Sequence, residues 1–195
     1  MTRAPARAAG ATASAPATLG CMSTRADTID LAPLRLSSGQ GHTAELEVEV
    51  EPFELSGQTY DVVPAVVPVR LDVSRTNGNG YALRLRFEAT LEGPCMRCLE
   101  PSRTTFAVDA REVDQPGAAD EELDSPYVEE DVVDVARWVN DALSLTLPPQ
   151  LLCRDDCAGL CAECGVNLNE SPDHAHETGP DPRWAKLREL KLPQE

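Results

Sequence analysis

Four stretches of the chain alternate between apolar and polar residues, with the period of two that a half-buried β-strand requires. They are residues 44–50, 66–73, 81–91 and 103–113. In the last of these, Thr104, Phe106, Val108 and Ala110 alternate with more polar neighbours. In the first three, the side chains predicted to face a core are Leu46, Val48, Val50, Val67, Val69, Leu71, Val73, Tyr81, Leu83, Leu85, Phe87, Ala89 and Leu91.

The turn between the second and third stretches predicts an antiparallel hairpin. Residues 76–80 read Thr-Asn-Gly-Asn-Gly, and Asn-Gly adopts positive φ at little cost. Pro64 and Pro68 near the start of the second stretch favour an edge position or a late start for that strand, because proline has no N–H to donate.

The period changes to that of a helix over residues 131–147, where valines recur every three or four positions beside Trp138. Asp131 is the predicted N-cap, and Pro148 with Pro149 prevents continuation. A second helix is predicted over residues 181–190, which begin Asp-Pro and carry a narrow apolar stripe.

These elements predict an α+β fold. We expect an antiparallel sheet or a partly open β-barrel with one packed helix, a cysteine-rich zinc-binding segment and a C-terminal helix. The predicted organisation is a disordered leader over residues 1–27 and a β-rich domain with an acidic loop and the helix over 28–150. Residues 151–195 form the cysteine-rich segment and C-terminal helix, packed on the same domain.

The formal net charge of −16 disfavours broad binding to a phosphate backbone and suits a basic partner better. Acidic residues crowd positions 109–134, whose middle we expect to be a solvated loop. No apolar run reaches the roughly 18–20 residues that cross a bilayer, and residues 1–21 lack the apolar core of a signal peptide. We therefore expect a cytoplasmic protein that does not bind a membrane.

All the cysteines except Cys21 fall into three close pairs, which without secretion favours metal over disulfides. A C-x-x-C turn brings two sulfurs to one side, where they can bind one tetrahedral ion, and Gly165 can take the positive φ that such a turn needs. The candidate zinc ligands are a first knuckle (Cys95 and Cys98), a middle pair (Cys153 and Cys157), a last knuckle (Cys161 and Cys164) and a histidine pair (His174 and His176).

The sequence leaves three ligand sets open. The two knuckles could join in one site, as they do in a zinc ribbon. The middle pair and the last knuckle could instead close a local four-cysteine site, and the middle pair with the histidine pair could form a second site. Sulfur ligands are in surplus, and no Ser-His-Asp set or phosphate-binding glycine loop is present. We therefore predict structural zinc and no enzymatic activity. The alternatives are a zinc- or thiol-dependent enzyme and a zinc-ribbon adaptor that binds a basic protein.

The order of these motifs resembles the YceD family over roughly residues 28–191. The resemblance is carried by Cys95-Met96-Arg97-Cys98, the Leu-Ser-Leu-Thr-Leu-Pro helix end, Cys157-Ala-Gly-Leu-Cys161, Asn167-Leu-Asn169 and Asp181-Pro-Arg-Trp-Ala-x-Leu187. It implies a role in the accumulation or processing of the large-subunit (23S) ribosomal RNA and no known catalytic activity. Many members carry Cys-x-Cys where this chain has the histidine pair, which keeps potential zinc ligands at that position.

Two kinds of partner follow from the resemblance and the charge. Large-subunit rRNA could be bound by a basic patch, for which the candidates are Arg84, Arg86, Arg97 and Arg103, although a solvated strand face is the simpler interpretation of the strand arginines. The alternative partner is a basic ribosomal or assembly protein, with the acidic run as the electrostatic face. We expect no small-molecule substrate.

Overall fold

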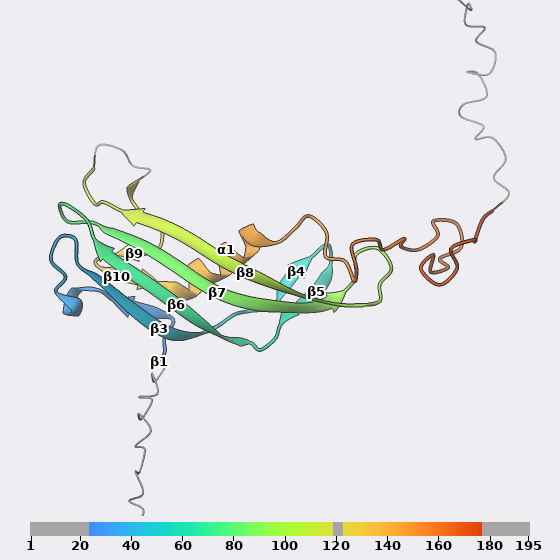
Figure 1. Ribbon diagram of the computed structural model, residues 1–195, viewed down its shortest axis with the longest axis horizontal. Helices are drawn as coiled ribbons and strands as arrows, with labels where there is room; N and C mark the ends of the chain where they lie inside the picture. Colours follow the sequence, from blue (N-terminus) through green and yellow to red (C-terminus); the bar gives the residue numbers. More distant parts are fainter. Residues whose placement is uncertain (1–23, 119–122, 177–195) are drawn as a thin grey trace, which may run out of the picture.

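The computed structural model describes residues 24–118 and 123–176, and the fold is α+β (Figure 1). Two open sheets and one helix make up these ranges. The elements in chain order are β1 (Thr24–Arg25), β2 (Thr28–Asp30), the 3-10 turn η1 (Ala32–Leu34), β3 (Gly41–Glu49), β4 (Phe53–Leu55), β5 (Gln58–Val62), β6 (Val66–Arg75), β7 (Tyr81–Pro94), β8 (Pro101–Asp114), β9 (Val128–Glu129), β10 (Val132–Asp134) and α1 (Val135–Thr146).

Strand β7 organises the larger, seven-stranded sheet, because three other strands pair with it. β8 pairs antiparallel with β7 along its whole length, from Tyr81↔Asp114 to Pro94↔Pro101. On the other edge of β7, β6 pairs with its first half and β5 with a short part of its second half. β3 extends the sheet beyond β6, and β1 adds a short parallel strand to β3. The predicted hairpin and the antiparallel sheet are confirmed.

The predicted alternation decides which face of the sheet is buried. The core-facing side chains predicted for β3, β6 and β7 are all buried, and Val48, Leu71 and Leu85 have no exposed surface. Helix α1 covers this face with Val135, Trp138, Val139, Ala142 and Leu143. Trp138 stacks on Tyr127 at 5.7 Å between ring centroids, which joins the helix to the segment before β9. No helix in the described parts of the chain has the length and apolar character required to cross a bilayer.

The helix begins later than its sequence period predicts. Residues 132–134 form strand β10, which pairs with β2 and β9, and the cap is Asp134, whose carboxylate accepts a hydrogen bond from the backbone N–H of Arg137 at 3.0 Å. Asp131, the predicted cap, instead accepts the Tyr81 hydroxyl at 2.9 Å. Consecutive valines favour an extended chain where a partner strand is available, and β2 provides that partner.

Two further predictions change in detail. β6 lies between β3 and β7, so the edge position suggested by Pro64 and Pro68 is wrong. The alternative, a late start, agrees with the pairing of β6 with β7, which begins only at Val69. β1 lies inside the predicted leader, so ordered chain begins before residue 28. The helix predicted over residues 181–190 lies outside the described residues, as does the leader up to residue 23.

The far end of the β7–β8 hairpin positions the cysteines. β7 ends at Pro94 and β8 begins at Pro101, so the first knuckle occupies the connecting loop. The segment after α1 returns to this end of the sheet (Figure 1). Beneath the loop, the buried Tyr60 ring lies against Gly93, and its hydroxyl donates to the Pro94 carbonyl at 2.8 Å.

We predict that Gly93→Ala destabilises the fold by about 1–3 kcal/mol, the usual cost of overpacking a filled core. A Cβ at residue 93 would lie 2.3 Å from Cδ1 of Tyr60, a buried ring held by its hydroxyl. Chemical denaturation measures the free energy of unfolding. Gly41→Ala is the comparison variant, since its nearest neighbours would lie at 3.3 and 3.4 Å, and a smaller change than for Gly93→Ala is expected there. Equal stability of Gly93→Ala and the parent would contradict the close contact.

Candidate metal centres

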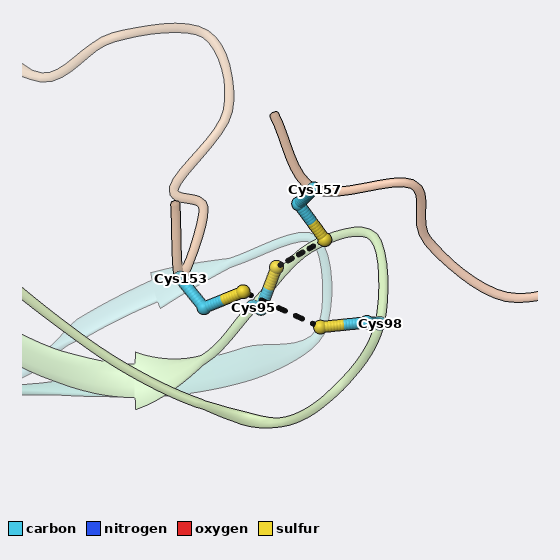
Figure 2. A group of neighbouring side chains, drawn as sticks. All are labelled: Cys95, Cys98, Cys153 and Cys157. Carbon is cyan, nitrogen blue, oxygen red and sulfur yellow. Dashed lines mark hydrogen bonds between the residues drawn. The ribbon is translucent and has the colours of Figure 1, made fainter. Parts of the chain in front are cut away.

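The first knuckle and the middle pair converge in one cluster, which we call the first cluster (Figure 2). The sulfur of Cys95 lies 3.8 Å from that of Cys157, and the sulfur of Cys98 lies 3.6 Å from that of Cys153. All four sulfurs lie within 4.8 Å of one another. Cys95, Cys98 and Cys157 are buried, and Cys153 is the most exposed of the four.

Backbone hydrogen bonds hold both halves of the first cluster. The Cys95 N–H donates to the Glu100 carbonyl at 2.7 Å and the Leu99 N–H to the Cys95 carbonyl at 2.9 Å, which closes the knuckle into a tight turn. The Met96 N–H donates to the Leu151 carbonyl at 2.9 Å, and the Ser102 hydroxyl donates to that of Leu152 at 2.8 Å. The chain after α1 is therefore fastened to the hairpin beside each of its cysteines.

The surroundings of the first cluster favour thiolates at two positions. Burial raises the pKa of Cys95, but the backbone N–H groups of Cys98 and Arg97 point at its sulfur and bring that pKa down to about 6. The side-chain amide of Asn169 donates to the sulfur of Cys157 at 3.4 Å and lowers the pKa of Cys157. Thiolate is the form of cysteine that binds a metal.

The last knuckle and the histidine pair form a second cluster, nearer the surface. The sulfur of Cys164 lies 3.1 Å from Nε2 of His174 and 3.2 Å from Nε2 of His176, and the two Nε2 atoms are 2.9 Å apart. The Gly165 N–H donates to the Cys161 carbonyl at 2.9 Å, and Gly165 takes the predicted positive φ of 74°.

Two features of the second cluster suit a metal centre. The backbone N–H groups of Cys164 and Glu163 lower the pKa of Cys161 to about 6, which favours its thiolate. The Glu163 carboxylate lies 3.3 Å from Nδ1 of His176, so it can orient the imidazole whose Nε2 faces the cluster.

Both clusters have the donor set and dimensions of a tetrahedral zinc site. Zn–S bonds of about 2.3 Å at tetrahedral angles place two sulfurs about 3.8 Å apart. The first cluster already has this spacing. The nitrogens and sulfur of the second cluster lie closer together and would move apart by about 0.4 Å to admit an ion with Zn–N bonds of about 2.0–2.1 Å. Each cluster could hold one metal ion.

The structure gathers the eight predicted ligands into two clusters of four, and neither cluster matches any of the three predicted ligand sets. The two knuckles do not share a site, because the Leu160 N–H donates to the Arg97 carbonyl at 3.1 Å and the chain passes the first knuckle before reaching Cys161. The middle pair is fastened to the hairpin and joins neither the last knuckle nor the histidines. The sequence could not show which cysteines share a site, because the cysteines that meet in the first cluster are 55 and 62 positions apart.

The four candidate RNA-binding arginines do not form one patch. Arg84 makes a bidentate contact with Asp109 at 2.8 and 2.5 Å. Arg86 pairs with Asp72, and Arg103 pairs with Glu92 at 2.6 Å. Arg97 donates to the Cys157 carbonyl at 3.1 Å. Glu92 lies six residues beyond Arg86 along β7, which corresponds to about 20 Å. Three of the arginines expected to bind phosphate are therefore already paired with carboxylates. The fourth, Arg97, instead contacts the backbone of the first cluster.

Asn167 and Asn169 gained no role from the sequence, although their Asn-Leu-Asn motif is part of the family resemblance. In the structure Asn169 contacts the sulfur of Cys157, and Asn167 accepts hydrogen bonds from both the backbone and the side chain of Asn169. The sequence held no signal for this contact, because Asn169 follows the last knuckle along the chain but donates to a cysteine of the middle pair.

The ion pairs on the exposed sheet face predict a pH-dependent stability. Hydrogen bonds from Thr43, Arg86 and Arg70 lower the pKa of Asp72 to about 2, below its value in an unfolded chain. Because the pKa is lower in the folded state, the ionised Asp72 carboxylate adds to the free energy of unfolding above about pH 4. This stabilisation is lost as the pH falls toward 2. We expect Asp72→Asn to cost about 1 kcal/mol at pH 7 and progressively less below pH 4, measured by denaturation at several pH values. A cost independent of pH would contradict this origin.

The comparisons with known proteins agree with the motifs. A family model described as "Large ribosomal RNA subunit accumulation protein YceD" matches residues 83–191. A Mycobacterium tuberculosis protein and a Mycobacterium bovis protein are each 40% identical over 107 residues, which cover 52% of this chain and 51% of the relative. A Mycobacterium leprae protein is 42% identical over 67 residues, 34% of this chain and 30% of the relative. All three are described as uncharacterized.

The chain thus spans about half the length of the Mycobacterium tuberculosis and Mycobacterium bovis relatives. No solved structure matches it. The family match covers more than half of the chain and includes β7 from Leu83 onward, β8, α1 and all eight candidate ligands of the two clusters. The chain therefore belongs to the YceD family of large ribosomal RNA subunit accumulation proteins.

Proposed function

We propose that this protein is a non-catalytic ribosome-biogenesis factor that supports the accumulation of large-subunit rRNA and contains two structural zinc ions. The observation that carries the proposal is the family match over residues 83–191, whose description names large ribosomal RNA subunit accumulation. The matched region holds both clusters, so the family match and the candidate metal centres fall in the same part of the fold.

The ligand count supports a structural role for zinc. A catalytic zinc keeps one coordination position for water or substrate, whereas each cluster here offers four protein ligands for four tetrahedral positions. In the first cluster, Cys95, Cys98 and Cys157 are only 0%, 4% and 1% exposed, so a substrate has little access to these three sulfurs. The first cluster would link the β7–β8 loop to the chain after α1, which is what a structural site does.

The charges favour a basic protein partner over naked RNA. The net charge is −16, and Arg84, Arg86 and Arg103 are each paired with a carboxylate. Within the acidic run, Asp124, Glu129 and Glu130 are exposed. Complementary charge steers partners together and sets specificity. We therefore propose that the protein acts through a basic ribosomal or assembly protein of the large subunit, in the cytoplasm.

We predict two zinc ions per purified chain, measured by elemental analysis. Cys98→Ser should lose one ion and about 3 kcal/mol of stability, because it breaks a link between segments 55 residues apart. Cys164→Ser should also lose one ion, with a smaller cost, because the second cluster closes only a short local loop.

Cys21→Ser is the matched cysteine control and should keep both ions, since Cys21 lies outside the clustered pairs of the sequence. A chain that contains no zinc, or that keeps both ions after Cys98→Ser, would refute structural zinc at the first cluster. An ion with an exchangeable water and a turnover activity would favour the zinc enzyme.

Loss of the protein in the cell should lower the ratio of 23S to 16S rRNA, and the parent chain should restore it. We expect a variant with Asp124→Asn, Glu129→Gln and Glu130→Gln to restore it less well and to capture fewer basic large-subunit proteins, because its electrostatic face is neutralised. Charge changes test this face better than deletion, because Ser125 is buried and Tyr127 stacks on Trp138.

The control neutralises three exposed carboxylates elsewhere, Glu45, Glu51 and Glu88, and has the same net charge as the test variant. Equal loss of capture by both variants would indicate a general charge effect. Direct crosslinking of the chain to 23S rRNA without a protein intermediary would replace the protein partner with RNA.

A further inference from the structure

The side chain of Asn169 contacts the first cluster from within the loop whose ends form the second cluster. Its amide nitrogen donates to the sulfur of Cys157, a member of the first cluster, at 3.4 Å. In sequence, Asn169 lies between Cys164 and His174, so it belongs to the loop whose two ends form the second cluster. Asn169 therefore contacts the first cluster and lies, along the chain, between the ligands of the second.

The orientation of the Asn169 amide is determined by its other contacts. Its oxygen accepts from the Ala158 backbone N–H at 2.8 Å and from the Arg154 guanidinium at 2.7 Å. Because both partners are donors, the oxygen must face them and the nitrogen must face the sulfur and Asn167. The amide is therefore placed as a hydrogen-bond donor to the sulfur of Cys157, in its thiolate form.

Successive backbone hydrogen bonds connect Asn169 to the second cluster. The Leu168 N–H donates to the Gly159 carbonyl at 2.9 Å, and the Ser171 N–H donates to that of Asn167 at 3.1 Å. The His174 N–H then donates to the Ser171 carbonyl at 3.1 Å. On the other side, the Cys161 N–H donates to the Val166 carbonyl at 2.8 Å. Fixing the last knuckle against the histidine pair therefore restricts the turn that carries Asn169.

We propose that the two metal centres are coupled, with Asn169 as the positioning residue through which an ion in the second cluster strengthens binding at the first. This inference rests on the proposed zinc binding and goes beyond it. An ion that joins the two ends of the loop reduces the conformational freedom of residues 165–173 before the first cluster is filled. The amide is then already in place to donate to the Cys157 thiolate, and binding at the first cluster no longer requires ordering of the loop.

The expected size of the coupling follows from second-shell hydrogen bonds in metal sites. Loss of such a bond typically costs 10–100-fold in metal affinity. The coupling is also reciprocal, because the factor by which one ion changes the affinity for the other is the same in both directions. Filling either cluster should accordingly raise the zinc affinity of the other by the same factor.

The test measures the affinity of the first cluster in the full-length chain by titration with cobalt(II) and then zinc against a competing chelator. Cobalt distinguishes the clusters, because its thiolate charge-transfer absorption grows with the number of sulfur ligands. The double variant His174→Ala with His176→Ala removes two ligands of the second cluster and leaves all four cysteines of the first. We expect it to weaken the first cluster about tenfold, and Asn169→Ala to do the same.

The matched control is Glu170→Ala, an exposed neighbour of Asn169 in the same turn, which should leave both affinities unchanged. Combining Asn169→Ala with the histidine changes should weaken the first cluster little more than either alone, because both remove the same contact. Factors that multiply in the combined variant would show that Asn169 does not carry the coupling and would overturn the proposal.

Failure of the coupling and failure of zinc binding give different results. If the parent chain binds two ions and the histidine variant retains the parent affinity at the first cluster, the centres are independent and only the coupling is refuted. If the parent chain binds no zinc, the proposed structural zinc and the coupling both fail.

Discussion

The meeting of four cysteine sulfurs at the end of the β7–β8 hairpin is the interaction on which the second half of the chain depends. Sulfurs within 4.8 Å of one another cannot all ionise without a cation, because like charges at that separation in a buried site repel strongly. Backbone N–H groups nevertheless favour thiolate at Cys95, and the Asn169 amide favours it at Cys157. A divalent ion would resolve this conflict and would link the chain after α1 to the sheet.

The sheet provides the rigid frame for that link. β7 and β8 pair over 14 residues each, so the loop that carries the first knuckle is held at one end of a long, regular hairpin. Tyr60 on β5 packs under this end and contacts both Gly93 and Pro94. Helix α1 packs on the buried face of the sheet, and the chain after its C-terminal end runs back to the cysteines (Figure 1). The first cluster therefore joins two segments that the core has already brought close.

Charge limits what this frame can bind. The exposed face of β6, β7 and β8 carries arginines in register with acids, and Asp72 and Asp109 compensate Arg86 and Arg84. Such a face is nearly neutral, while the chain as a whole is strongly acidic. This acidic charge is consistent with the proposed action through basic proteins, and the family description links the chain to large-subunit ribosomal RNA.

The sequence by itself determined the four long strands (β3, β6, β7 and β8), the hairpin, the buried face and the identity of the eight candidate ligands. It could do so because alternation, Asn-Gly turns and C-x-x-C spacing are local signals that act within a few residues. Only the tertiary structure decided which ligands meet, because the first cluster joins residues 55 and 62 positions apart that the fold of the whole sheet brings together. The same holds for Asp134 replacing Asp131 as the helix cap, since the partner strand β2 is remote in sequence. It holds as well for Asn169, whose role exists only where the Cys157 sulfur lies beside it.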